Sequence, residues 1–274
     1  MCNACVTAAV KERMLSRRDF FRASAGGVAA AAAGGGALMT SAPAALAQGA
    51  RRVTDMTHLF SPEFPTFGGV PGISMQKEFD FATDGYNLYT LTVDEHSGTH
   101  IDAPLHFSAD GMSVDELPLS SLVVPLCVID IRARAAEDRD TRVTPDDIRA
   151  WIAAHGEIPD NACVAMNSGW AAKVGSAAFR GDDSGLHFPG FHVEAAEMLM
   201  EETGAQVLAV DTLSLDHGPS ADFATHYAWL PSGRYGIECM AGLDEVPAAG
   251  ATLMVGAPKV QGGTGGQARV IALH

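Results

Sequence analysis

The sequence predicts a mixed α/β fold, in which strands and helices alternate along most of the chain. Short runs of apolar and β-branched residues are separated by segments with helical periodicity, and helix-capping residues open one of these segments. The chain has 274 residues, 47% of them hydrophobic, which is enough for one large core. No internal repeat or low-complexity linker interrupts residues 48–274. We therefore expect this range to form a single domain.

Residues 1–47 are expected to lie outside this domain. Adjacent arginines at 17 and 18 precede an Ala/Gly-rich stretch of modest hydrophobicity, which ends in an Ala-Leu-Ala triplet at 45–47. This order is typical of a twin-arginine export signal that is cleaved after Ala47. A membrane anchor is the alternative, but glycines at 34–36 and Pro43 interrupt the apolar run that a spanning helix needs. We expect a periplasmic or extracellular protein with no stable membrane anchoring after processing.

The first half of the predicted domain begins with strands. Residues 52–60 have the pattern of a first strand, and residues 61–75 are rich in proline and glycine, which indicates a loop. Residues 86–95 alternate between apolar and polar side chains, as a strand does. Residues 122–131 form an apolar run of the length expected for a buried strand.

Helices enter in the second half. Thr144 is placed to cap a helix whose first turn contains Pro145 and Asp147, three residue types that favour helix N-termini. The elements expected after it are a strand running into a loop at 162–170, a helix at 191–204 closed by Gly204, and strands at 206–212, 251–260 and 268–274.

Composition and missing motifs exclude several classes of function. The formal net charge of −15 argues against a nucleic-acid partner, because phosphate binding needs lysine and arginine. No GxSxG nucleophile elbow is present, which argues against a serine hydrolase. The GGTGG segment at 262–266 lies between two expected strands with no helix after it, so it indicates a tight turn and not a nucleotide-binding loop. The three cysteines beyond the export signal lie in apolar runs and are expected to be buried thiols.

The most informative feature is the stretch HSGTHIDAPLH at 96–106, which contains three histidines and one aspartate at even-numbered positions. If the preceding strand continues, alternate side chains share one face, and His96, His100 and Asp102 converge on its polar side. Two imidazoles and one carboxylate are ligands that suit zinc or manganese. The stretch therefore predicts a metal site.

A helix or a metal-free strand fits this stretch less well. A helix would also align His96 with His100, but Gly98 and Pro104 disfavour a helix here. A hydrogen-bonded polar strand face without a metal is the simplest alternative. The spacing of the ligand types favours metal coordination over it.

A pair of metal ions would need further donors from later in the chain. The segment after the strand at 206–212 offers Asp216, His217, His226 and Glu238. Strand ends and the loops that follow them are where α/β proteins place their chemistry. The residues alone do not select His226 and Glu238 over Asp216 and His217.

The chain resembles the metal-dependent cyclase family, which includes bacterial kynurenine formamidases and isatin hydrolases. Besides HSGTHIDAPLH, the resemblance rests on HFPG at 187–190, DTLSLD at 211–216 and GGTGGQARVIAL at 262–273, and it extends over nearly all of 52–274. It implies the swivelling β/β/α architecture of that family, with a mixed sheet. It also implies a homodimer or homotetramer.

The resemblance implies roles for particular residues. His106, the last histidine of the motif, matches the family's acid/base residue. A later histidine and a glutamate twelve residues beyond it complete the family's two-metal site, and His226 and Glu238 have that separation. The ligands implied for one or two divalent ions, zinc or manganese, are His96, His100, Asp102, His226 and Glu238.

The chain departs from the family's pattern at three places. His217 and Gln267 stand where the family commonly has proline. The early loop carries Phe64 and Phe67, where the formamidases have a tryptophan. The last difference weakens an assignment to kynurenine formamidase, although not to the hydrolase chemistry.

The expected function is metal-dependent hydrolysis of a C–N bond in a small N-formyl arylamine, amide or lactam, in the manner of an arylformamidase or isatin hydrolase. Water activated by a divalent cation would attack the carbonyl, and His106 would pass a proton to the leaving nitrogen. One alternative is an exported metal-dependent binding protein without turnover, and another is a metal site that only braces the fold. The side chains expected to contact the substrate are Phe67, Trp170, His187, Phe188 and His217.

Overall fold

The computed structural model describes residues 52–274, and the expected export signal at 1–47 lies outside the described residues. The described residues divide into a larger unit, 52–74 with 92–274, and a smaller unit, 75–91. No helix within 52–274 combines the length and the apolar composition needed to cross a bilayer.

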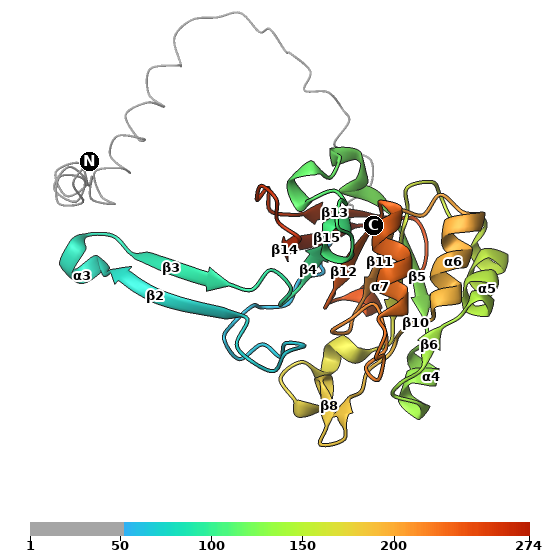
Figure 1. Cartoon of the computed structure of the whole chain (residues 1–274), viewed down its shortest axis with the longest axis horizontal. Coiled ribbons are helices and arrows are strands. Elements are labelled where there is room, and N and C mark those ends of the chain that lie inside the picture. Colours follow the sequence, from blue (N-terminus) through green and yellow to red (C-terminus); the bar gives the residue numbers. More distant parts are fainter. Residues whose placement is uncertain (1–51) are drawn as a thin grey trace, which may run out of the picture. The chain divides into compact units, whose positions relative to one another are not determined.

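The larger unit is built on a nine-stranded mixed sheet (Figure 1). Four neighbouring strands run parallel in the middle, and antiparallel strands extend the sheet on both sides. This arrangement confirms the mixed α/β class predicted from the sequence. In spatial order the strands are β1 (Val53–Asp55), β15 (Arg269–Leu273), β13 (Ala251–Gly256), β5 (Val123–Asp130), β7 (Cys163–Asn167), β11 (Val207–Val210), β12 (Tyr235–Glu238), β4 (His100–Asp102) and β14 (Gly265–Gln267).

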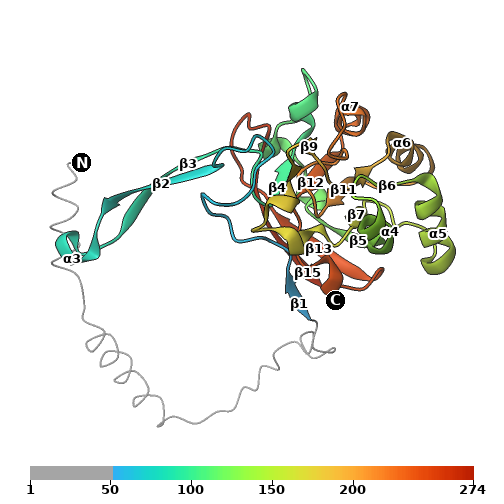
Figure 2. The ribbon, with the colours of Figure 1, turned by 90° about the horizontal axis from the view of Figure 1, so that it is seen from below.

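Apolar side chains cover both faces of this sheet, because successive residues of a strand point to opposite sides. In β5, Leu126 and Val128 belong to one core cluster, which also collects side chains from the antiparallel strands. Cys127 and Ile129 belong to a second cluster, which the helices α5 (Pro145–His155) and α6 (Val193–Glu202) complete. Figure 2 shows these two helices lying on the same side of the parallel strands.

The helix expected after residue 143 begins where its capping residues indicated. Thr144 is the N-cap of α5 and forms a capping box with Asp147, and Pro145 occupies the first turn. The predicted end of the second helix is wrong, because α6 stops at Glu202 with Thr203 in an extended conformation. Gly204 instead allows a close approach, since a Cβ there would clash with the carboxylate of Asp160.

Shorter elements complete the larger unit. They fill the connections between the main strands, and several carry residues of the site. They are α4 (Arg132–Glu137), the β6 (Arg142–Val143) and β10 (Gly190–Phe191) pair, the β8 (Gly181–Asp182) and β9 (Gly185–Leu186) pair, α7 (Ala224–Trp229), and the 3-10 helices η2 (Pro104–Phe107), η3 (Val114–Glu116), η4 (Leu119–Ser121), η5 (Trp170–Lys173), η6 (Ala177–Phe179), η7 (Leu230–Ser232) and η8 (Leu243–Glu245).

The smaller unit contains most of a two-stranded ribbon, which is made by β2 (Ile73–Phe79) and β3 (Leu88–Val93) with α3 (Phe81–Asp84) between them. The strand expected at 86–95 is therefore present, while β2 begins inside the range expected to be a loop. All six residues of β3 are exposed in the described chain. The alternating pattern thus marks a strand here, although neither of its faces is buried.

Asp211 directly follows β11, and its side chain forms hydrogen bonds with the loop that follows β7. Its buried carboxylate accepts hydrogen bonds from the backbone N–H groups of Ser168 and Trp170 and from the hydroxyl of Ser168. Burial raises the pKa of Asp211 to about 6, although these hydrogen bonds act in the opposite direction.

Replacing Asp211 by asparagine is expected to change how the free energy of unfolding depends on pH. Because the folded-state pKa of about 6 lies above the ordinary 3.8, the carboxyl contributes stability below about pH 4 that is lost as the pH rises through about 6. A pKa difference of this size corresponds to about 3 kcal/mol in the free energy of unfolding. Urea unfolding across this range should show wild type losing that amount relative to Asp211→Asn. A difference independent of pH would contradict the assignment.

Candidate metal centre

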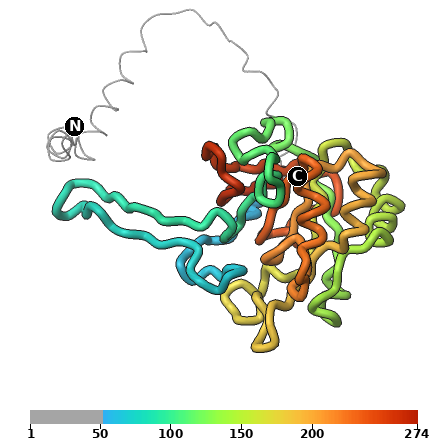
Figure 3. The backbone as a smooth tube through the Cα atoms, in the orientation of Figure 1, coloured from blue at the N-terminus to red at the C-terminus, as the bar shows by residue number. Residues whose placement is uncertain are grey.

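Strand β4 places two of the expected ligands on one face, because His100 and Asp102 are two residues apart. β4 lies between β12 and β14, two strands from the last quarter of the chain (Figure 3). In the antiparallel register of β4 with β12, Glu238 is the partner of His100. Side chains of such a pair project from the same face. Sheet register therefore brings Glu238 to the motif.

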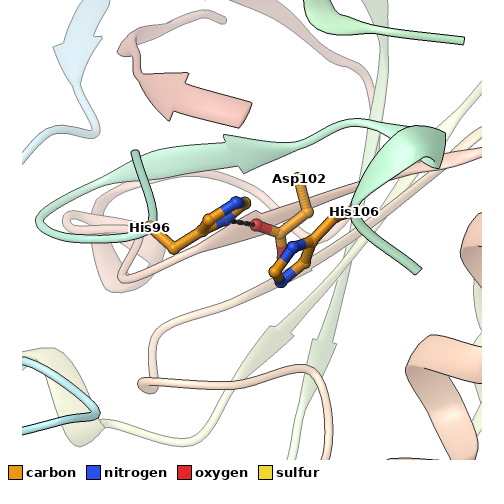
Figure 4. A group of neighbouring side chains, drawn as sticks. All are labelled: His96, Asp102 and His106. Carbon is orange, nitrogen blue, oxygen red and sulfur yellow. Dashed lines mark hydrogen bonds and ion pairs between the residues drawn. The ribbon is translucent and has the colours of Figure 1, made fainter. Parts of the chain in front are cut away.

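His96 does not lie on an extended strand, which corrects the prediction from the sequence. β3 ends at Val93, and the chain turns before β4 begins. Gly98 has a φ of 68°, in the left-handed region, and a Cβ there would come within 2.8 Å of the ring of Phe60. This turn brings His96 back to the strand, with its Nδ1 atom 2.7 Å from Oδ1 of Asp102 (Figure 4).

The third expected histidine comes from α7. The Nδ1 atom of His226 is 2.6 Å from Oδ2 of Asp216, which also accepts the backbone N–H of His226. Its Nε2 atom faces the opposite way, 3.2 Å from Oε1 of Glu238 and 3.6 Å from Oδ2 of Asp102. His226 and Glu238 are only 3% and 6% exposed. They therefore do not form a surface ion pair.

His100 shows most directly that the site fits a cation. Its Nδ1 atom lies 2.9 Å from the carbonyl oxygen of Gly98, and since a carbonyl only accepts, Nδ1 carries the hydrogen. Nε2 lies 3.3 Å from an oxygen of Asp102 and 3.3 Å from an oxygen of Glu238. The Nε2 atom of His100 and Oδ2 of Asp102 are buried without a hydrogen-bond partner. A cation among these atoms would satisfy both of them.

Charge within the cluster leads to the same conclusion. Burial lowers the pKa of His100, but Asp102 and Glu238 together raise it to about 10. The pKa of His226 is raised well above its usual value and that of Asp102 is held well below, in each case against the effect of burial. The carboxylates thus stabilise positive charge at this point. A divalent cation would displace the protons of the imidazoles and take up the same charge.

Asp102 is common to two overlapping groups of donor atoms. The ligand atoms of His100, Asp102 and Glu238 lie within 4.8 Å of one another, and so do those of His96, Asp102 and His106. The carboxylate of Asp102 is therefore available to either of the two metal positions that the family resemblance implies.

His106 lies in η2, directly after β4, with Pro104 at the start of the helix. Its ring stacks on the ring of His96, with centroids 3.7 Å apart and planes inclined by 18° (Figure 4). Burial lowers the pKa of His106 to about 4, although Asp102 acts in the opposite direction. The ring is therefore neutral at pH 7 and can accept a proton.

Four residues of the cluster, His96, His106, His226 and Glu238, line a cavity of about 320 Å³, and His100 and Asp102 are buried behind them. Phe223, at the start of α7, has a left-handed backbone with a φ of 50°, and its ring lies beside those of Phe67 and Phe107. The cavity therefore combines an apolar wall with polar side chains from the donor cluster. The wall is formed by Phe67, Val70, Phe107, Leu213 and Phe223, and the polar side chains of the lining are Thr66, Asp94, His96, His106, Ser214, His226 and Glu238.

Of the five side chains expected to contact a substrate, Phe67 lines this cavity. Phe188 and Trp170 are buried behind it in a separate core cluster. The ring of Phe188 lies 6.5 Å from that of Phe67, so it supports the wall without reaching the cavity. The geometry gives these two residues no place on the wall.

His187 and His217 are also absent from the lining of this cavity. The ring nitrogens of His187 lie 2.7 Å from a carboxylate oxygen of Asp140 and 2.9 Å from the hydroxyl of Ser184. Burial lowers the pKa of His217. The wall residues Phe107 and Phe223 were not predicted from the sequence, although Phe107 directly follows the motif. Their positions in the sequence, next to His106 and three residues before His226, could have indicated that they lie near the site.

Comparison with known proteins identifies the family. The family model described as "Putative cyclase" matches residues 54–217. The chain belongs to the cyclase family. Solved structures of related proteins have the mixed-sheet α/β architecture that the sequence resemblance implies for this chain.

An isatin hydrolase from Roseibium aggregatum is 32% identical over 250 residues, which cover 84% of this chain and 94% of that protein. A kynurenine formamidase from Salinibacter ruber is 28% identical over 188 residues, covering 68% and 79% of the two chains. Among solved structures, isatin hydrolase A from Labrenzia aggregata, bound to benzyl benzoate, has a TM-score of 0.78 at 34% identity and covers 84% of this chain and 96% of its own. An isatin hydrolase bound to the product analogue thioisatinate has a TM-score of 0.78 at 28% identity, with 95% and 99% covered.

Proposed function

We propose that this cyclase-family protein hydrolyses the C–N bond of a small N-formyl arylamine, amide or lactam at the centre formed around Asp102. The chain is a hydrolase of amide C–N bonds, as its isatin hydrolase and kynurenine formamidase relatives are. One observation carries the assignment of the site. Ring nitrogens of three histidines converge on the carboxylates of Asp102 and Glu238, next to a cavity that His96, His226 and Glu238 line.

Zinc or manganese suits this donor set of imidazole nitrogens and carboxylate oxygens, in one or two positions. The residues that would hold the metal are His96, His100, Asp102, His226 and Glu238. When bound, the metal supplies Lewis-acid activation of water and of the substrate carbonyl.

The chain's own residues supply proton transfer and binding. The neutral ring of His106 faces the cavity, where it can take a proton from water and return it to the leaving nitrogen. An amine leaves poorly unless it is protonated, so this second transfer is required. The rings of Phe67, Phe107 and Phe223 form an apolar wall that suits an aryl group and excludes water from it. A protein that only binds its ligand would have no need of a neutral histidine at this position.

Export and self-association complete the proposal. The arginine pair and the Ala-Leu-Ala triplet at 45–47 support twin-arginine export to the periplasm or the extracellular space. Detection of the processed chain outside the cytoplasm tests this. Exposed apolar side chains in the 75–91 ribbon support a homodimer or homotetramer, because an isolated two-stranded ribbon is marginally stable. The molecular mass in solution tests it.

Removal of the metal is the experiment that tests the function. Protein dialysed against a chelator should remain folded, because the two large core clusters contain none of the donor residues, and it should lose turnover of isatin and N-formylaniline. Zinc or manganese should restore turnover, and metal at about 100 times its Kd should raise stability by about 2.7 kcal/mol. An aliphatic formamide of similar size serves as the comparison substrate and should react more slowly. Full turnover after complete metal removal would overturn the proposal, and unfolding would favour a purely structural metal.

A further inference from the structure

The Gly-rich segment 262–267 was expected from the sequence to be only a tight turn. In the structure it also contacts the turn that carries His96. Residues 265–267 form β14 and pair with β4. We infer that Thr264 and Glu95 are positioning residues, which fix the ring of His96 in the orientation and tautomer that direct Nδ1 toward the metal centre. The inference rests on the proposed function in one respect, that His96 is a ligand.

Hydrogen-bond donors and acceptors determine the tautomer. The hydroxyl of Thr264 donates to Oε2 of Glu95 at 2.6 Å, and the backbone N–H of Thr264 donates to the same oxygen at 3.2 Å. The hydroxyl of Thr264 also lies 2.8 Å from Nε2 of His96. Because a hydroxyl has only one hydrogen, it can only accept a hydrogen bond from Nε2. Nε2 therefore carries a hydrogen.

This leaves the other ring nitrogen to face the centre. Nδ1 of His96 lies 2.7 Å from Oδ1 of Asp102. A lone pair at that distance from a carboxylate oxygen is repelled unless a proton or a metal ion lies between the two atoms. The hydrogen bond with Thr264 thus leaves the lone pair of Nδ1 facing Asp102, where a cation would be bound.

The three histidines of the centre are fixed in three different ways. His100 is held by a backbone carbonyl and His226 by the carboxylate of Asp216. His96 is held by a neutral hydroxyl, and the hydroxyl is in turn oriented by Glu95. Partners of this kind set the orientation and basicity of a ligand, and their loss typically lowers metal affinity about 10- to 100-fold.

Close backbone packing maintains the contact. A Cβ at Gly265 would come within 2.6 Å of Cε1 of His96, and a Cβ at Gly263 within 2.9 Å of Oε1 of Glu95. Glycine at both positions therefore allows the segment to lie against the turn. Gln267, at a position where the family commonly has proline, donates its side-chain amide to the carbonyl oxygens of Asp94 and Ser97 at 2.6 and 3.1 Å, on either side of His96.

Three variants test the inference, with zinc and manganese affinity of metal-free protein measured by titration calorimetry. Thr264→Val keeps the shape of the side chain but removes the hydroxyl, and it should weaken binding about 10- to 100-fold. Glu95→Gln should also weaken metal binding. Thr264→Ser keeps the hydroxyl and should retain metal affinity within about threefold of wild type, a much smaller change than the loss expected for Thr264→Val. In zinc-loaded wild type, ¹⁵N shifts of the ring should show Nδ1 coordinated and Nε2 protonated.

Thr54→Val is the matched control, because the hydroxyl of Thr54 lies 3.0 Å from Nε2 of His274 and neither residue lines the cavity. It should leave metal affinity unchanged. If wild type binds neither metal, the proposed function fails. If wild type binds and Thr264→Val binds equally well, the inference is overturned. Should Thr264→Val not fold, Glu95→Gln decides the outcome by the same criterion.

Discussion

Replacing Asp102 by asparagine is expected to abolish hydrolysis and to remove most of the metal affinity. Asp102 is fully buried, and its two oxygens face the Nδ1 atom of His96, the Nε2 atom of His100 and the Nε2 atom of His226. The uncharged amide would turn one acceptor into a donor among these nitrogens and would remove the charge that a cation needs there. Since the two candidate donor groups both include Asp102, this single change affects both metal positions.

The size of the effect separates a ligand from a supporting residue. Loss of a residue that only orients a ligand lowers metal affinity about 10- to 100-fold, so Asp102→Asn should exceed that range and reduce kcat/KM to background. Elemental analysis and calorimetry measure the metal, and circular dichroism checks the fold. Asp140→Asn is the control, because Asp140 contacts His187 outside the cavity. Normal metal content in Asp102→Asn would show that the centre is located elsewhere.

The parts of the fold that were predicted correctly depend on short-range patterns. The start of α5 follows from Thr144, Pro145 and Asp147, which act within one turn. The strands β5 and β11 follow from apolar runs that need no knowledge of their neighbours. β14 was missed because Gly265–Gln267 has no strand propensity of its own and is held by pairing with β4.

The candidate site shows the same division. The residue types in HSGTHIDAPLH indicate metal ligation whatever the backbone does, so the motif could be identified although its predicted geometry was wrong at His96. The meeting of Glu238 with His100 depends on the register between β12 and β4, which no local pattern encodes. The cavity wall combines Phe67 and Phe223 from loops about 150 residues apart in the numbering. Only the folded chain could show that these rings are neighbours.

His106 presents the sharpest remaining choice of role, because its ring is near enough to His96 and Asp102 to be a ligand as well as an acid/base. We expect His106→Ala to lower kcat about 100- to 10,000-fold, the usual contribution of general acid/base catalysis, while metal content stays at the wild-type level. The pKa of about 4 that burial gives this residue keeps its ring neutral throughout the neutral range. The loss should therefore be present at every pH between about 5.5 and 8, where a ring of pKa about 4 stays unprotonated.

The pattern of substrate dependence tests this role further. A leaving nitrogen of low basicity needs less help from a proton donor, so amides of more acidic anilines should be less affected by His106→Ala. Added imidazole should restore part of the activity, since the truncated side chain leaves space beside the ring of His96. His106→Gln keeps hydrogen bonding but cannot exchange a proton in this range, and it should behave as the alanine variant does. If instead the metal is lost together with activity, His106 is a ligand, and the proton must be carried by another group lining the cavity.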